Sequence, residues 1–339
     1  MNHDHDPLWD PSQPADAELR RMENLLASYR LRPTTLNLAA KPRVSRRASL
    51  RRWLPALAAG ILLALSIPAW LQYRLAWQDG RAWQATTAET GGHPEALTIA
   101  PGNSVTTTAG QTATITVARI GSVRLSPDST LRLVETRAGR HRVSLAHGHL
   151  RARIWAPPGY FGVASGAAEV VDLGCDFDLW KQADGHGRVY VHSGWIAYEA
   201  ADRQILVPAG FEVHFDPQQV STPIRRGAGP ALQGAVGTLE IALAESGENS
   251  TETLQAASDV AAKLEDADAF TALSLLTRYP KLAATALYPR LARALGASAD
   301  DASHHAAWVA GDHDAINAWW QRIPTPPKRW WANWRDAFN

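Results

Sequence analysis

The residues best suited to chemistry include a single cysteine. Cys175 stands among three acids, Asp172, Asp176 and Asp178. A reactive thiol needs an electropositive, partly exposed setting, and neighbouring carboxylates oppose one. Cys175 is therefore predicted to be a small, buried, apolar side chain. With one cysteine in the chain, neither an intrachain disulfide nor a zinc site built on several cysteines can form.

Several histidines could hold a metal, but none belongs to a complete set of ligands. His147 and His149 could form half of a site, yet no third ligand is fixed by spacing. A solvated turn is the preferred interpretation. A second group is interpreted as part of a polar tail: His3, Asp4, His5 and Asp6. A third group is interpreted as residues at helix ends: His304, His305 and His313. The sequence thus predicts no metal site.

Known catalytic motifs do not occur in the sequence. It contains no G-x-S-x-G, H-E-x-x-H, P-loop or G-x-G-x-x-G pattern. Asp176 and Asp178 alternate along a strand-like stretch and have no catalytic signature. The chain is therefore predicted not to be an enzyme and to need no cofactor.

The distribution of charge argues against a nucleic-acid partner. The formal net charge is +1, so the chain has no global basic field of the kind that attracts nucleic acid. The first 52 residues differ from the rest, because they hold ten Lys or Arg against six acids. No direct contact with nucleic acid is predicted.

One apolar run predicts a membrane anchor. Trp53–Tyr73 (WLPALAAGILLALSIPAWLQY) has 21 residues and no formal charge. About 20 apolar residues span a bilayer as a helix, and aromatic rings at both ends suit the headgroup level. Arginines crowd residues 43–52, which places residues 1–52 in the cytoplasm by the positive-inside rule. The expected location is the bacterial inner membrane, single-pass, with the C-terminal domains in the periplasm.

The N-terminal tail has an apolar stripe without a core of its own. Residues 17–30 are predicted to form an amphipathic helix, because apolar residues recur three and four apart. Such a short helix is marginal alone, so its stripe needs a cytoplasmic partner or the membrane surface, and both alternatives stay open. The residues assigned to partner binding are Leu8, Trp9, Leu19, Met22, Leu25 and Leu26.

After the apolar run the pattern changes twice. Residues 74–94 are predicted to be a stem. Residues 95–216 hold short β-branched runs with period-2 alternation, broken by Gly, Pro and Asp, which favours an all-β sandwich or roll. Residues 230–339 are rich in alanine with helical periodicity, and hold six of the fourteen tryptophans in the last 32 residues. This last segment is predicted to be an α-helical bundle or a short solenoid.

The β segment resembles the FecR domain of membrane-bound regulators that work with extracytoplasmic-function sigma factors. Three phrases carry the resemblance, in the family's order, and Cys175 stands where the family has threonine. They are Gly121–Leu133, then Arg142–Ile154, and a third made of Phe161–Ser165, Val170–Leu179 and Val189–Tyr198. The D-P-L-W-D start, the amphipathic helix and the Trp-rich helical end are similar to a recurring subgroup of these proteins.

The resemblance completes the predicted architecture. The expected fold is multidomain with α and β segregated: a cytoplasmic tail (1–52) with a short helix, one transmembrane helix (53–73), a stem, an all-β FecR-like sandwich or roll, and C-terminal helices. Family membership implies a regulator that senses an envelope signal with its periplasmic β domain and controls a sigma factor through its tail. The alternative is an envelope structural protein, or one that binds a glycan or protein, without a sigma-factor partner.

Overall fold

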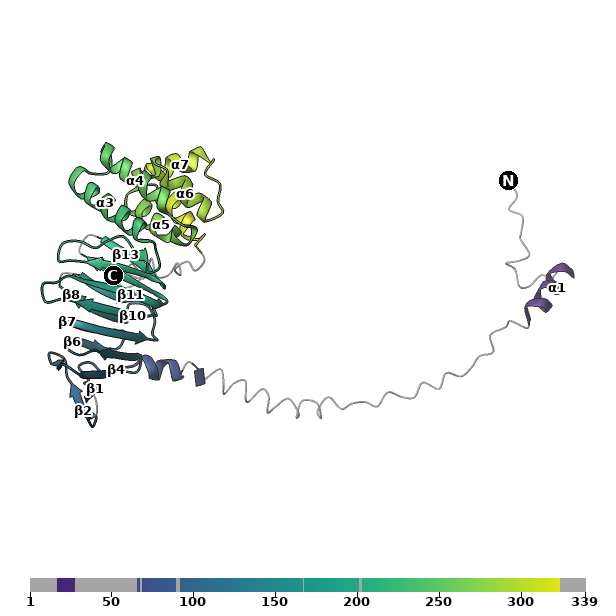
Figure 1. Cartoon of the computed structure of the whole chain (residues 1–339). Coiled ribbons are helices and arrows are strands. Elements are labelled where there is room, and N and C mark those ends of the chain that lie inside the picture. The colour runs from purple at the N-terminus through teal and green to yellow at the C-terminus, as the bar shows by residue number, and fades with distance from the viewer. Residues whose placement is uncertain are drawn as a thin grey trace, which may run out of the picture. The chain divides into compact units, whose positions relative to one another are not determined.

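The computed structural model of the protein describes residues 17–27, 66–67, 69–89, 92–166, 168–200 and 203–323 (Figure 1). The chain divides into two compact units, Met1–Leu65 and Ser66–Asn339. The first is described by one helix only. The second holds all the strands and the remaining helices.

The helix of the first unit is α1 (Ala17–Leu26). Glu18 stands in its first turn, where a negative charge complements the helix dipole. Its apolar side chains are open to solvent: Met22, Leu25 and Leu26 are 56%, 68% and 59% exposed. The described helix lies within the predicted range 17–30. Leu8, Trp9 and the Leu19 side chain lie outside the described residues.

The fold prediction is wrong in its transmembrane helix. Much of Trp53–Tyr73, namely 53–65 and Pro68, lies outside the described residues. In the part of the chain that is described, no helix has the length and apolar character needed to cross a membrane. Residues 69–75 are helical, but they are far fewer than the roughly 20 that a bilayer requires. The Arg119 guanidinium holds this turn to the β domain by donating to the Tyr73 carbonyl over 2.6 Å.

The structure instead shows one connected sheet of 15 strands followed by helices. We call its two parts the A half (β2–β1–β4–β5–β7–β10–β11–β14–β15) and the B half (β3–β6–β7–β8–β9–β12–β13); they share β7. Neighbours are antiparallel except β7 and β8. The strands are β1 (Trp83–Glu89), β2 (Glu95–Ile99), β3 (Ser104–Thr107), β4 (Gln111–Val117), β5 (Gly121–Leu125), β6 (Ser129–Arg137), β7 (Arg140–Ile154), β8 (Phe161–Ser165), β9 (Ala168–Asp172), β10 (Asp176–Lys181), β11 (Gly187–Ser193), β12 (Trp195–Ala200), β13 (Arg203–Pro208), β14 (Phe211–Phe215) and β15 (Ile224–Arg225).

The shared strand β7 is longer than the sequence predicted. A solvated turn was expected at His147 and His149, within this strand. Gly148 instead bends one continuous strand, with φ +104°. A Cβ there would lie 2.2 Å from the Ser129 Oγ atom, so only glycine fits. Residues up to 147 pair with β6 and β8, and residues 148–154 pair with β5 and β10.

Alternation along the strands decides which side chains are buried. In β10, Phe177 and Leu179 are fully buried, whereas Asp176 and Trp180 remain partly exposed. The inward side chains of both halves belong to one hydrophobic cluster that continues into the helices. Burial of this shared core is the main favourable contribution to stability.

The helices follow the last strand and pack against the end of the sheet. They are α3 (Pro230–Ser246), α4 (Thr251–Lys263), η2 (Asp266–Asp268), α5 (Ala269–Arg278), η3 (Pro280–Ala284), α6 (Leu287–Ala294), α7 (Ala302–Val309) and α8 (His313–Trp320). Arg225 of β15 donates to the buried Asp268 carboxylate over 2.7 Å. Phe270 of α5 contacts Trp195 and Phe211 of the sheet edge to face. The sheet and the helices therefore share one packed boundary.

Candidate functional site

Nine polar or aromatic side chains cover the middle of the A half. They occupy alternate positions on three neighbouring strands, because the residues between them point into the core. We call this surface the polar face. It consists of His149, Arg151 and Arg153 of β7, Asp176, Asp178 and Trp180 of β10, and Arg188, Tyr190 and His192 of β11.

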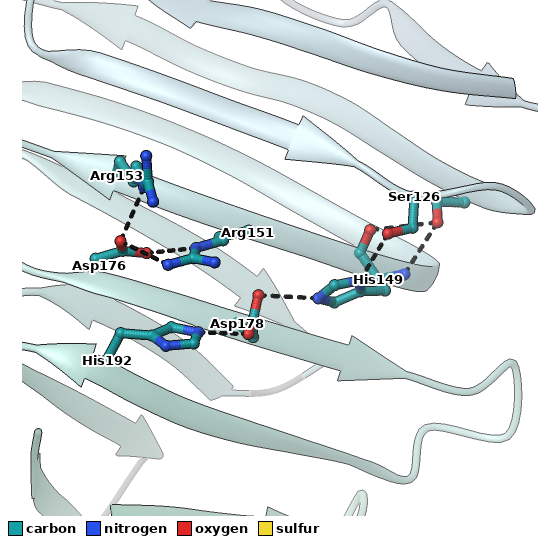
Figure 2. A network of polar contacts seen from close by, with 8 residues as sticks. Ser126, His149, Arg151, Arg153, Asp176, Asp178 and His192 are labelled. Carbon is teal, nitrogen blue, oxygen red and sulfur yellow. Dashed lines mark hydrogen bonds and ion pairs between the residues drawn. The ribbon is translucent and has the colours of Figure 1, made fainter. Parts of the chain in front are cut away.

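A carboxylate at the centre of the polar face links two histidines (Figure 2). The Asp178 oxygens lie 3.0 Å from His149 Nε2 and 2.6 Å from His192 Nε2. Burial alone would raise the pKa of Asp178, but the hydrogen bonds and charges of the two imidazoles outweigh it, and the pKa is lowered. The carboxylate is thus ionised at neutral pH and accepts a hydrogen bond from each ring.

Ser126 extends this arrangement to the end of β5. Its Oγ atom lies 2.7 Å from His149 Nδ1. In the tautomer with its proton on Nε2 toward Asp178, Nδ1 of His149 can accept the Ser126 hydroxyl proton. Serine, histidine and aspartate follow one another as in a nucleophile–base–acid array. Here the same histidine ring also stacks on Trp180, with centroids 4.5 Å apart and planes inclined by 5°, so the array holds His149 in one orientation.

A second carboxylate, Asp176, joins the arginines of the polar face. Arg151 donates Nε and Nη2 to its two oxygens over 2.8 and 2.9 Å, and Arg153 donates Nε over 2.8 Å. Burial raises the pKa of Asp176, but the bonds to the two guanidinium groups outweigh it and lower the pKa. The bidentate geometry of Arg151 is the form in which arginine and carboxylate pair most strongly.

Cations and aromatic rings complete the surface. The Arg188 guanidinium lies 4.0 Å from the Trp180 ring centre, and Arg226 lies 4.4 Å from that of Tyr190. Tyr190 and His192 meet edge to face, with centroids 4.7 Å apart. Such contacts contribute on the order of 1 kcal/mol each where they are partly desolvated. The polar face is therefore a rigid, mutually paired array suited to recognition.

Replacing Asp178 with asparagine is expected to lower the free energy of unfolding by about 2 kcal/mol. The amide has one acceptor oxygen, so one histidine N–H loses its partner at a site where the carboxyl is only 10% exposed. Urea titration at pH 7 measures the change. Asp184→Asn is the matched control, since that carboxylate also contacts a histidine, His186, but is 58% exposed; its change should stay within about 0.5 kcal/mol. Equal effects would contradict a stabilising role for the Asp178 network.

Cys175 is buried, as the sequence predicted. Its Sγ donates to Asp172 Oδ1 over 2.6 Å, and the backbone N–H groups of Gly174 and Cys175 donate to the same carboxyl. Complete burial raises the pKa of Asp172 to about 7 against these bonds. Burial, and then the charge of Asp172, raise the pKa of the Cys175 thiol. A protonated, inaccessible thiol closes the turn before β10 and is not a nucleophile.

The other singled-out residues lie apart from one another. His147 is exposed, whereas His149 belongs to the polar face, so the solvated turn is a wrong interpretation of His149. His304 and His305 lie near the start of α7 and His313 begins α8. The histidines at positions 3 and 5 lie outside the described residues. Among the residues with described positions, no group of three or more His, Cys, Asp or Glu could hold a metal ion.

The polar face itself was missed at the level of sequence. Ser126 follows β5, whereas His149 and Asp178 belong to β7 and β10, and the three are separated by 23 and 29 residues. A usable signal was present: the outward positions of three strands read His-x-Arg-x-Arg, Asp-x-Asp-x-Trp and Arg-x-Tyr-x-His. Charged and aromatic residues at every second position of adjacent strands must meet on one face.

Comparison with known proteins identifies the central part of the chain. Residues 103–197 match the family model described as FecR protein. This segment contains Ser126 and all nine side chains of the polar face. The predicted resemblance to the FecR domain is thereby confirmed for these residues.

Solved structures show weaker likeness. Two crystal structures of a candidate anti-sigma factor from Parabacteroides distasonis match at 16% identity and a TM-score of 0.32. Each match covers 40% of this chain, and 65% or 64% of the other; the chain thus spans slightly less than two thirds of that protein. A search of curated proteins found no match.

Proposed function

We propose that this chain controls an extracytoplasmic-function sigma factor through its N-terminal tail, and that its FecR domain receives the controlling signal on the polar face. The match over residues 103–197 supports a FecR-type regulator, and it is the observation that carries the proposal. The sigma factor, the envelope origin of the signal and the periplasmic location of the FecR domain are parts of the proposal.

The apolar stripe of α1 supports a role for the tail in binding. Met22, Leu25 and Leu26 are each more than half exposed. Exposed apolar surface contributes about 25 cal/mol per Å² when a partner covers it, and a helix presenting such a stripe fits a groove on another protein. With Trp9 nearby in sequence, the tail has the aromatic and aliphatic residues that dominate binding energies.

A double substitution in the tail tests the proposal. Trp9→Ala with Leu25→Asp should abolish co-purification of the sigma factor from the native host and change transcription of its target genes. Loss of an aromatic anchor alone removes about 2 kcal/mol, or some 30-fold in affinity. Both readouts are measured on the full chain at matched protein levels.

Asn24→Asp is the matched control, because it adds the same carboxylate to α1 beside the apolar stripe, and it should change neither readout. If no sigma factor co-purifies with the unaltered chain and transcription is the same in all three strains, the regulator proposal fails. The chain would then fit the alternative of an envelope protein that binds a glycan or protein.

A further inference from the structure

A cavity of about 580 Å³ lies where the sheet meets the helices, and all of its lining residues except His186 lie outside the FecR match. Its walls come from the end of β14, the loop that follows it, α3, and the C-terminal end of α5. This volume falls in the range of sites that enclose small molecules or one to two side chains of a peptide. The polar face lies on other strands and does not contribute to it.

Part of the cavity wall is apolar. Phe215 and Val220 are buried in the sheet and its following loop, and Leu243 is buried on α3. Tyr279 lines it from the end of α5. Ile241 of α3 also lines the cavity and is 61% exposed, a large value for isoleucine. An occupant with an aromatic or aliphatic body would cover this surface.

Acidic groups line the same space. Asp216, Glu240 and Glu245 are carboxylates of the lining, and Arg278 is its guanidinium. Arg278 is already engaged: it donates Nη1 to the Val220 carbonyl over 3.0 Å and lies 5.1 Å from the Tyr279 ring centre. Two histidines, His186 and His214, also line the cavity and lie 3.3 and 3.5 Å from the carboxylates of Asp184 and Glu212. The lining therefore holds three carboxylates against one guanidinium and two imidazoles that already contact acids, so the cavity favours a cationic occupant.

Glu240 is the most enclosed of these acids. Its Oε1 accepts the backbone N–H of Thr222, which fixes the carboxyl against the cavity wall. Burial raises the pKa of Glu240, although the Thr222 bonds and the charges of Arg278 and His214 act in the opposite direction. A positive group brought into the cavity would compensate for the burial of this carboxylate.

The last helix that the structure describes, α8, contacts α5 beside this cavity. Trp320, the last residue of α8, donates its indole N–H to Thr277 Oγ1 over 3.1 Å, and Thr277 is followed by Arg278 and Tyr279 of the lining. Beyond Ile323 the sequence is PTPPKRWWANWRDAFN, which lies outside the described residues. Lys328 is the fifth residue after Ile323, a reach of roughly 17 Å when the chain is extended.

We propose that the cavity is a peptide site for a basic residue next to tryptophan, and that its ligand is the chain's own sequence Lys328–Trp331. The basic groups would meet Glu240, and an indole would cover the Phe215, Ile241 and Tyr279 surface. The inference goes beyond the proposed function, since it adds a site at the other end of the chain and does not depend on a sigma factor.

A labelled synthetic peptide, PPKRWWAN, tests the site with the full chain. In the unaltered protein the linked segment competes at an effective concentration near millimolar. We expect a fourfold substitution, Lys328→Ser, Arg329→Ser, Trp330→Ser and Trp331→Ser, to free the cavity. Fluorescence anisotropy should show the peptide binding this variant at least 10-fold more tightly than the unaltered chain. Absence of binding to the variant, or equal binding to both proteins, would overturn the proposal.

Two glycines of α3 provide a matched pair that locates the binding. Gly237 lines the cavity and Gly234 does not, and a Cβ at either would meet no atom within 4 Å. In the fourfold background, Gly237→Leu should fill the cavity and abolish peptide binding, whereas Gly234→Leu should leave it unchanged. Thermal melting of both variants checks that each is folded. An equal effect of the two leucines, or none from Gly237→Leu, would place the peptide elsewhere.

Glu240→Gln tests the charge. Glutamine keeps an oxygen that can accept the Thr222 N–H, so the wall should stay in place while the negative charge is removed. We expect at least 5-fold weaker peptide binding in the fourfold background. Glu248→Gln, on the same part of the chain but outside the lining, should have no effect. Unchanged binding by the Glu240 variant would contradict recognition of a basic residue.

Discussion

Replacing Gly148 with alanine is expected to lower the free energy of unfolding by about 4 kcal/mol. Part of the loss is backbone strain, because φ at Gly148 is +104° and residues with a Cβ rarely adopt it. The larger part is steric, since the new Cβ would lie 2.2 Å from Ser129 Oγ and 2.5 Å from Ser129 Cα. Urea unfolding at neutral pH measures the change.

Movement of Ser129 would not relieve this contact without cost, because the side chain is held by hydrogen bonds. Its Oγ donates toward the Pro127 and His149 carbonyls and accepts the His149 N–H over 2.9 Å. Gly102→Ala is the matched control, because φ there is +90° and no atom lies within 4 Å of the added Cβ. That substitution should cost only the strain, about 1–2 kcal/mol. Equal losses at the two glycines would show that the close contact at Ser129 is relieved without cost.

The second large effect is a pH dependence caused by His141. This side chain is buried in β7, and burial together with the charge of Arg142 lowers its pKa to about 4, against a small opposing effect of Glu135. Trp83 donates its indole N–H to Thr136 Oγ1, whose proton is directed at His141 Nδ1 over 2.8 Å. The neutral ring is thus the form that the folded protein accommodates.

The direction of the pH dependence follows from the protons that the folded and unfolded chains bind. The unfolded chain takes up a proton near pH 6.5 and the folded chain only near pH 4, so acidification through this window favours unfolding. This difference in pKa lowers the free energy of unfolding by about 3 kcal/mol at pH 4, relative to neutral pH. Asp172, whose pKa is raised to about 7, contributes in the opposite direction, because stability falls as the pH rises from 3.8 to 7. The stability of the unaltered protein alone would therefore mix the two effects.

Comparison with His141→Gln separates them. Glutamine can accept the Thr136 proton but does not titrate. At pH 7.5 the variant should have a lower free energy of unfolding than the unaltered protein. Between pH 7.5 and pH 4 the difference between the two free energies should change by about 3 kcal/mol in favour of the variant. Urea titrations at both pH values measure it. A gap that does not depend on pH would refute the assigned protonation of His141.

Local signals in the sequence predicted strands but not the way in which they meet. Period-2 alternation predicted short strands in residues 95–216, and β2 to β14 lie in that segment. The turn expected near His149 does not form, because Gly148 carries the strand onward and burial on both sides favours continuation. Sequence periodicity contains no information about a bend that depends on the close approach of Ser129.

The candidate site required tertiary pairing. Asp178 contacts residues 29 positions before it and 14 after it, and nothing local in the sequence specifies that β10 lies between β7 and β11. The apolar run at 53–73 is a case in which a strong local signal led to a wrong prediction. Hydropathy alone predicted a spanning helix, and within the described residues the helical part is a short turn bound to Arg119.

The continuity of β7 has a consequence for how the β domain responds to stress. A protein with two sheets joined only by loops can lose one sheet while the other persists, as separate cooperative units. Here the backbone of one strand carries ladder hydrogen bonds to both halves, residues 141–147 in one and 148–154 in the other. Opening either half exposes the neighbouring bonds of the same strand. Loss of the ladder at His149 on the polar face would therefore open a strand that holds the buried His141 eight residues away, in the other half.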